Sequence, residues 1–230
     1  MRTEVSLWQK YFDFSQVDWQ KVMEATKDTV YLTLVATFII FFVGMILGIL
    51  LYALGHSKKT WGKLGYGLVS IITNVLRAIP FMVLLIFLMP VTKYLMGTTI
   101  GVKAAYPSLV LSASPFFARL VEMALREVDG GVLEAANAMG ASPLQIFFKV
   151  LIPESLPALI SGLTVTTVSM IGFTAMAGVI GAGGLGQLAW NTGFQRGNYT
   201  VILVATVMIT LFVFLIQGIG DFIVKKVDKR

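Results

Sequence analysis

The sequence predicts an all-α, polytopic membrane protein with five spanning helices. Two observations lead to this fold class. The first is composition: 57% of the 230 residues are hydrophobic and 13% are charged, whereas soluble domains carry about 25% charged residues. The second is that uncharged or nearly uncharged runs of about 20 residues, long enough to cross a bilayer, recur along the chain.

Each predicted span is an apolar run bounded by charged or polar residues. The runs are residues 29–54, 66–89, 104–125, 156–180 and 200–224. The first contains Gly44 and Gly48, whose four-residue spacing permits close helix approach. The second is interrupted by Arg77 and Pro80, and the third is the least apolar. Arg119, Glu122 and Arg126, at the end of the third, are expected to form a surface set of ion pairs.

Residues 1–28 are expected to be separate from the membrane domain of residues 29–230. They contain five acidic residues and several aromatic ones, and they lack the apolar core of a signal peptide. Mixed aromatic and charged residues are typical of a segment at the membrane–water interface. A poorly ordered tail is the alternative.

The distribution of Lys and Arg predicts the orientation in the membrane. Five spans put the termini on opposite sides. Ten basic residues then fall on the side of the C-terminus: Lys58, Lys59, Lys63, Arg119, Arg126, Lys149, Lys225, Lys226, Lys229 and Arg230. Seven fall on the other side: Arg2, Lys10, Lys21, Lys27, Lys93, Lys103 and Arg196. Because basic residues are enriched on the cytoplasmic side, the C-terminus is predicted inside and the N-terminus outside.

Several kinds of chemistry are excluded by the residues present. The chain has no cysteine and one histidine, His56, so it lacks the ligands for a zinc site. No carboxylate pair or Ser/His/Asp set lies within the spans, so the chain is not expected to be an enzyme or to bind a cofactor. The net charge of +6 is assigned to membrane topology and not to nucleic-acid binding.

The cytoplasmic loop of residues 129–153 contains residues that are typical of the ends of two short helices. Asp129 can cap the first helix, and Gly140 can end it in the left-handed conformation that glycine tolerates. Ser142 can cap the second helix, with Gln145 three residues later completing a capping box.

The contents of these two helices suggest a surface that contacts another protein. Pro143 suits the first position of the second helix, and Pro153 is expected to end it. Ala136 and Gly140 lie four residues apart and would give the first helix a bare face. Glu134 offers an exposed carboxylate in the first turn.

The spacing of Glu134, Ala135, Ala136, Gly140 and Pro153 resembles the EAA loop of ABC importer permeases. The resemblance implies the fold of a type I ABC importer permease. It also implies that the loop, from here on called the coupling loop, carries a coupling helix that inserts into a cleft of a separate ATPase. The chain has no phosphate-binding loop motif of its own, so ATP and Mg would be bound by that partner.

A translocation pathway or gate is expected near the charged, methionine and glycine residues of the spans. Arg77 is costly in hydrocarbon and should face the protein interior or water, close to the helix-breaking Pro80. Its alternative is a shifted span from which Arg77 reaches the interface. Met170 and Met176 are candidate gate residues because methionine seals irregular gaps, with ordinary packing as the alternative.

A glycine-rich segment follows the fourth span, and Gly181, Gly183 and Gly184 belong to it. It matches the glycine pattern of dinucleotide-binding loops but lacks the preceding strand and the later acidic residue that such loops need. A tight turn is therefore expected. A flexible lip over the pathway, where a binding protein delivers substrate, is the functional alternative.

Further segments resemble the permeases of methionine ABC importers. They are residues 119–128, 134–143, 172–187 and 214–221, and the likeness extends over about residues 29–228. It implies a homodimer in the bacterial cytoplasmic membrane, two ABC ATPase subunits, an extracytoplasmic substrate-binding lipoprotein and surrounding membrane lipid. It also implies uptake of methionine, often of both enantiomers. A permease for another amino acid and an ATPase-independent secondary transporter are the alternatives.

Overall fold

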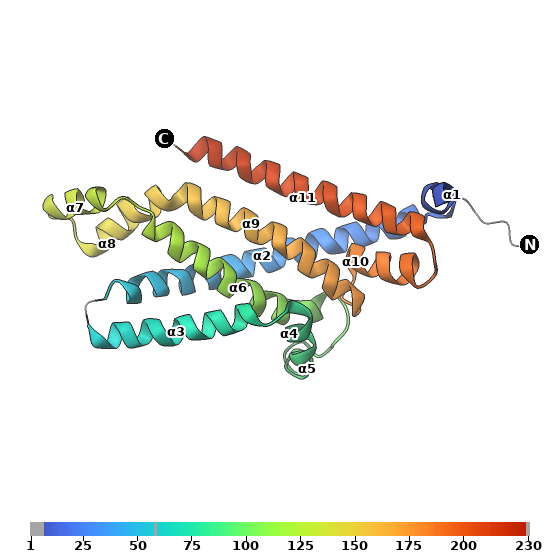
Figure 1. The fold of residues 1–230 in the computed structure, drawn as a ribbon, viewed down its shortest axis with the longest axis horizontal. Coiled ribbons are helices and arrows are strands. Elements are labelled where there is room, and N and C mark those ends of the chain that lie inside the picture. The colour runs from blue at the N-terminus through green and yellow to red at the C-terminus, as the bar shows by residue number, and fades with distance from the viewer. Residues whose placement is uncertain (1–6, 58, 229–230) are drawn as a thin grey trace, which may run out of the picture. The chain divides into compact units, whose positions relative to one another are not determined.

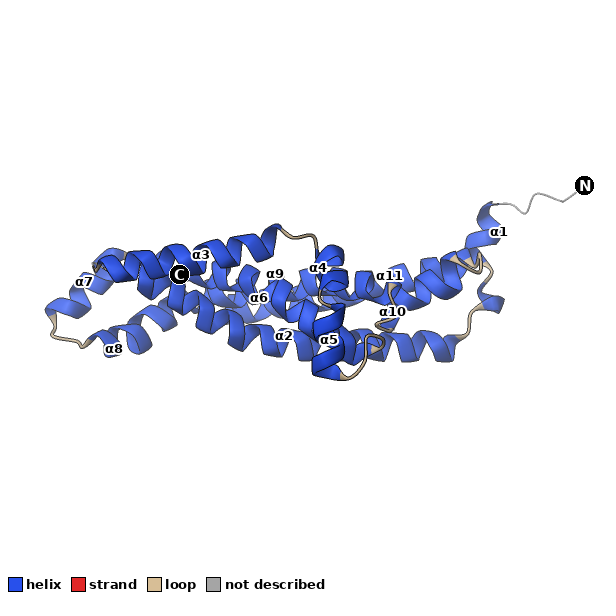
Figure 2. Cartoon of the chain, turned by 90° about the horizontal axis from the view of Figure 1, so that it is seen from below, coloured by secondary structure: helices blue, strands red, loops and turns tan. Residues whose placement is uncertain are grey.

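Helices account for nearly all of the computed structural model, which describes residues 7–57 and 59–228. Within these residues the regular elements are helices, and none is a strand (Figure 2). The prediction of an all-α protein is therefore confirmed.

Four helical segments among the described residues are long and apolar enough to cross a membrane. They are α2 (Trp19–Gly55), α6 (Val102–Arg126), the segment Pro143–Val179 and α11 (Tyr199–Val227). A fifth crossing arises if α3 (Thr60–Ala78) and α4 (Phe81–Phe87) form one broken span. These segments, labelled in Figure 1, correspond to the five predicted spans.

The second predicted span consists of two helices because Pro80 interrupts it. α3 ends at Ala78, and α4 begins directly after Pro80. A proline lacks an amide hydrogen and disfavours helical backbone in the residue before it. Ile79 is accordingly extended, with φ −76° and ψ 122°. A short helix, α5 (Met89–Met96), follows α4.

The first long helix begins ten residues before the predicted span. α1 (Leu7–Phe12) and the 3-10 turn η1 (Phe14–Gln16) precede it, and α2 starts at Trp19. The Asp18 carboxylate accepts a hydrogen bond from the backbone N–H of Lys21, at 3.2 Å, and so caps the helix. The expected division at residue 28 thus falls inside α2, because apolarity measures the membrane-crossing length and not the full length of a helix.

The described chain divides into two compact units. One contains residues up to 37, 80–110 and 167–216, and the other contains residues 38–79, 111–166 and those from 217 onward. α2, α6, α9 (Ile152–Val179) and α11 contribute residues to both units. The coupling loop and α3 belong to the second unit, whereas α1, α4, α5 and α10 (Gly184–Leu188) belong to the first.

In the second unit, α2 packs directly against α6 at its two glycines. A Cβ atom at Gly48 would lie 2.5 Å from Val121 Cβ and 2.6 Å from the carbonyl oxygen of Ala118. One at Gly44 would lie 2.7 Å from Cδ1 of Phe117. The spacing that permits close helix approach therefore serves a contact within the chain.

Candidate coupling loop and pathway residues

The first helix of the coupling loop, α7 (Gly130–Ala138), is closed at both ends as predicted. The Asp129 carboxylate accepts hydrogen bonds from the backbone N–H groups of Gly131 and Val132, at 2.8 and 3.3 Å. At the other end Gly140 has φ +79°. Its backbone N–H donates to the carbonyl of Asn137, and that of Ala141 donates to the carbonyl of Ala136. This pair of bonds is the Schellman motif.

The second helix, α8 (Pro143–Ile146), begins with the predicted capping box. The Gln145 N–H donates to the Ser142 hydroxyl at 3.4 Å, and the Ser142 N–H donates to the Gln145 side chain at 2.8 Å. Pro143 occupies the first turn, where its missing N–H costs nothing. The local chemistry of Gly140, Ser142, Pro143 and Gln145 therefore sets the corner between α7 and α8.

The prediction that Pro153 ends the second helix is wrong. α8 continues through a π-helical segment, η2 (Phe147–Leu151), directly into α9. At the junction the Ile152 N–H donates to the carbonyl of Phe147, five residues back. A proline ring normally collides with the carbonyl four residues before it, and the wider π turn moves that carbonyl away. Pro153 therefore sits within continuous helix.

The expected bare face of α7 is also not formed as predicted. Ala136 is half-buried and lies within the helix, whereas Gly140 lies beyond its end in the left-handed conformation. The two residues therefore do not share a helical face. Glu134 is exposed, as expected, but it is the fifth residue of α7 and lies in the second turn instead of the first, because the helix begins at Gly130. Ala135 is also exposed.

Large apolar side chains on the coupling loop were missed by the sequence reasoning. Met139 is 87% exposed, Leu144 71% and Phe148 65%. Figure 1 shows α7 and α8 at the free end of the adjoining parts of α6 and α9. The available signal was the presence of large apolar residues in a loop that connects two spans. Exposed apolar groups beside a carboxylate suit a contact with another protein.

Arg77 lies in the last turn of α3 with an exposed side chain. Its guanidinium carbon lies 5.9 Å from the centre of the Phe116 ring, within the range of a cation–π interaction. Among the described residues, no carboxylate lies within ion-pair distance of Arg77. The structure therefore gives Arg77 an aromatic neighbour but no counter-charge.

The two candidate gate methionines differ in accessibility. Met170 is completely buried, which favours the alternative of ordinary packing. Met176, six residues further along α9, is 46% exposed. Of the two, Met176 remains the gate candidate.

The glycine-rich segment forms the predicted tight turn between α9 and α10. Gly181, Gly183 and Gly184 all have positive φ angles, of 95°, 87° and 77°. The Leu185 N–H donates to the Thr29 hydroxyl at 2.8 Å, and a Cβ atom on Gly184 would lie 2.6 Å from that oxygen. The turn is thus closely packed against α2, which differs from the flexible lip offered as the alternative.

A buried carboxylate joins α3 to α6 in the second unit, where surface ion pairs were expected. Glu122 is 2% exposed and forms ion pairs with Arg119 and, at 2.6 Å, with Arg126. The Tyr66 hydroxyl of α3 donates to the same carboxylate at 3.1 Å. The guanidinium of Arg126 also lies 5.6 Å from the centre of the Tyr66 ring. The expectation was wrong because Tyr66 covers Glu122 from a distant part of the sequence.

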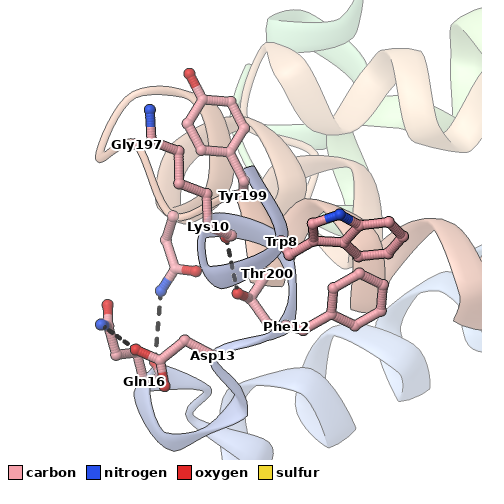
Figure 3. A pocket seen from close by; sticks show the side chains of 9 residues that line it. Trp8, Lys10, Phe12, Asp13, Gln16, Gly197, Tyr199 and Thr200 are labelled. Atoms are coloured by element: carbon pink, nitrogen blue, oxygen red, sulfur yellow. Dashed lines mark hydrogen bonds between the residues drawn. The ribbon is translucent and has the colours of Figure 1, made fainter. Parts of the chain in front are cut away.

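A hollow of about 770 Å³ lies elsewhere, between the N-terminal segment and the start of α11 (Figure 3). The Thr200 hydroxyl donates to the carbonyl of Lys10 at 3.1 Å and ties the two segments together. The hydrogen bond from the Ser15 hydroxyl lowers the pKa of Asp13. Trp8 and Phe12 stack at its rim with exposed rings. None of the predicted pathway or coupling residues lines this hollow.

Comparisons with known proteins find methionine transport permeases as relatives of this chain. The methionine import system permease protein MetP of Bacillus subtilis (strain 168) is 50% identical over 224 residues, covering 97% of this chain and all of MetP. The probable D-methionine transport system permease protein MetI of Vibrio cholerae is 42% identical over 213 residues, covering 91% and 93% of the two chains. A chain of the MetNI methionine ABC transporter, solved in inward-facing conformations, superposes with a TM-score of 0.87 at 40% identity, covering 92% of this chain and 98% of that one.

The family match agrees with these relatives, because it too describes a membrane component of a transport system. Residues 44–230 fit the family described as binding-protein-dependent transport system inner membrane component. The predicted fold class, the multi-pass membrane character and the assignment to transport instead of enzyme catalysis are confirmed. The chain belongs to the family of inner membrane components of binding-protein-dependent transport systems.

Proposed function

We propose that this chain is the permease subunit of an ABC importer that takes up methionine. The observation that carries the proposal is the 50% identity to a methionine import permease over nearly the full length of both chains. Transport is driven by ATP hydrolysis on a separate subunit. That partner binds ATP and Mg, and this chain holds no cofactor.

The coupling loop is the proposed docking site for the ATPase. Exposed Met139, Leu144 and Phe148 can enter an apolar cleft, and the Glu134 carboxylate can pair with a cation at its edge. The caps at Asp129 and Ser142 fix the shape of the loop before docking, which reduces the entropy lost on binding. Both features support a contact that transmits force.

The proposed assembly is a homodimer of this chain in the bacterial cytoplasmic membrane, with two ATPase subunits and an extracytoplasmic binding lipoprotein. The N-terminus lies outside and the C-terminus inside, as supported by the ten basic residues on one side of the predicted spans and the seven on the other. The exposed Trp8 and Phe12 rings suit the outer membrane–water interface. Membrane lipid covers the remaining apolar helix faces.

Alternating access is the proposed mechanism. ATP binding draws the ATPases and their docked coupling loops together, and the permease opens outward to accept cargo from the binding protein. Hydrolysis restores the inward-open form. Arg77, Pro80 and Met176 are proposed pathway or gate residues, and the turn at Gly181–Gly184 is proposed to form the outer end of the pathway.

Uptake of labelled methionine tests this function. Cells with and without the chain are compared, each in the presence and absence of the ATPase partner, with other unlabelled amino acids as competitors. We expect uptake that needs both proteins and is suppressed by unlabelled methionine. Stronger suppression by another amino acid would reassign the cargo, and uptake without the ATPase would replace the importer with a secondary transporter.

A further inference from the structure

We propose that one flank of α3 forms a water-facing wall of the translocation pathway and that Arg77 on this flank binds the carboxylate of the passing amino acid. The inference rests on the proposed import of an amino acid and adds to it the surface that the cargo meets. The flank, called the polar stripe, consists of Lys63, Tyr66, Ser70, Asn74 and Arg77.

The spacing of the polar stripe places its members on one side of the helix. Successive residues are separated by three or four positions, which is the repeat of one helical turn. A second stripe on the same helix is apolar and exposed, and consists of Leu64, Leu68, Ile71 and Val75. Because an apolar exposed face of a spanning helix suits lipid, the polar stripe needs a different environment.

The middle and end of the polar stripe are not covered by the chain itself. Asn74 and Arg77 are exposed and Ser70 is half-buried. The only side-chain hydrogen bond found for Asn74 within the described residues is a long one of 3.5 Å to the Ser70 hydroxyl, and Arg77 faces the Phe116 ring. Tyr66, by contrast, is closed off by its hydrogen bond to Glu122. The open part of the stripe therefore consists of Ser70, Asn74 and Arg77.

Water is the environment that suits this open part. Polar side chains inside a membrane normally face a bundle interior or a water-filled cavity, because lipid offers them no hydrogen bonds. The guanidinium of Arg77 is a cation with five N–H donors, and lipid offers it no acceptors. A pathway wall hydrates all three side chains at once.

The ligand follows from the charge of Arg77. A guanidinium presents a planar fork of donors that matches a carboxylate, and within the described residues Arg77 has no carboxylate partner. Every amino-acid cargo carries a carboxylate on its backbone. Arg77 would bind the carboxylate of the cargo, and the amide of Asn74 would contact its backbone. Neither contact would discriminate between different amino-acid side chains.

Water accessibility can be tested in a naturally cysteine-free chain. Ser70→Cys and Asn74→Cys report on the polar stripe, and Leu68→Cys, Ile71→Cys and Val75→Cys are matched controls on the apolar stripe. The full complex in membranes is treated with a charged, water-soluble thiosulfonate reagent. Because only a hydrated thiolate reacts, we expect labelling of the polar stripe to be about tenfold faster or more. Equal rates on both stripes would overturn the proposal.

Carboxylate binding is tested by protection. Methionine should slow the labelling of Ser70→Cys, a variant that keeps both Arg77 and Asn74, several-fold. Methioninol, in which an alcohol replaces the carboxylate, should not. The protection should disappear with Arg77→Gln and survive in part with Arg77→Lys. Equal protection by both compounds, or protection that survives Arg77→Gln, would contradict the role of Arg77.

Two further outcomes keep this inference separate from the proposed function. If the unmodified importer takes up methionine but Ser70→Cys and Asn74→Cys crosslink between two copies and resist the reagent, the stripe is a subunit contact and only the inference fails. If methionine uptake itself is absent, the function fails, although the accessibility of the stripe is still measured. The amount of each variant in the membrane shows that it has folded and inserted.

Discussion

Single residues in the coupling loop carry distinct physical tasks, and Glu134 and Gly140 illustrate them. Glu134 is exposed, so it contributes little to the fold and is free to contact a partner. Gly140 is required for its backbone conformation, because φ is +79° and open space surrounds the position of a Cβ atom.

Reversing the charge of Glu134 should disrupt coupling without disrupting folding. Glu134→Arg is expected to abolish methionine uptake while the amount of protein in the membrane stays unchanged, because the side chain touches solvent in the isolated chain. Uptake and membrane abundance are the measurements. Glu127→Arg, another exposed carboxylate outside the loop, serves as the control, and normal uptake with Glu134→Arg would refute the docking role.

Gly140 allows backbone strain to be separated from steric bulk. Gly140→Leu should abolish uptake, because the left-handed conformation costs a non-glycine residue about 1–2 kcal/mol and the loop would change shape. Gly140→Asn should retain much more, because asparagine tolerates this conformation. Uptake and co-purification of the ATPase are measured for both variants, and an equal loss in the two would contradict the backbone explanation.

Removing the buried charge of Glu122 should destabilise the link between α3 and α6. Glu122→Gln leaves Arg119 and Arg126 close together without their counter-charge, a loss of about 3 kcal/mol for a buried pair. Both arginines remain partly hydrated, so this figure is an upper value. The midpoint of thermal unfolding in detergent is the readout, and Glu127→Gln, which is exposed, should leave it nearly unchanged.

At the scale of elements, the parts that follow local chemistry were predictable. Asp129, Ser142 and Gly140 each act through neighbours within five residues, so their types and spacing were sufficient to predict the caps. The helix continues past Pro153 because the preceding segment is π-helical, and no residue pattern predicts a π-helical segment there.

The other features that were not predicted at this scale depend on packing and on partners far away in the sequence. The burial of Glu122 requires Tyr66, which is 56 positions away, so a surface ion-pair set was the natural expectation from spacing alone. The start of α2 at Trp19 was missed because charged residues can continue a helix outside the hydrocarbon. The complete burial of Met170 was not predictable, because burial depends on packing that periodicity does not reveal.

The contact between α2 and α6 gives a prediction for a whole element. Gly48→Ala should weaken it, because the new methyl group would lie 2.5 Å from Val121 Cβ. Gly67→Ala in α3 is the matched control. Its methyl group meets open space, and alanine favours a helix over glycine by about 1 kcal/mol. Thermal unfolding should shift in opposite directions for the two variants, and a shift in the same direction would argue against close packing at Gly48.

At the scale of the whole molecule, the proposed orientation can be tested with single cysteines. Lys10→Cys should react with a membrane-impermeant thiol reagent in intact cells, whereas Lys226→Cys should react only after the membrane is opened. Both side chains are exposed, so packing does not limit either reaction. The reverse pattern would invert the topology and place the coupling loop outside, away from any ATPase.

The local hydrogen bonds of the coupling loop also have a consequence for the order of assembly. The caps of α7 and α8 all close within five residues, and short-range contacts of this kind form in about microseconds. Synthesis adds only about 5–20 residues per second. The loop should therefore reach its final shape while the ribosome is still making α11. A nascent permease can then present its ATPase-binding surface before it is able to transport cargo.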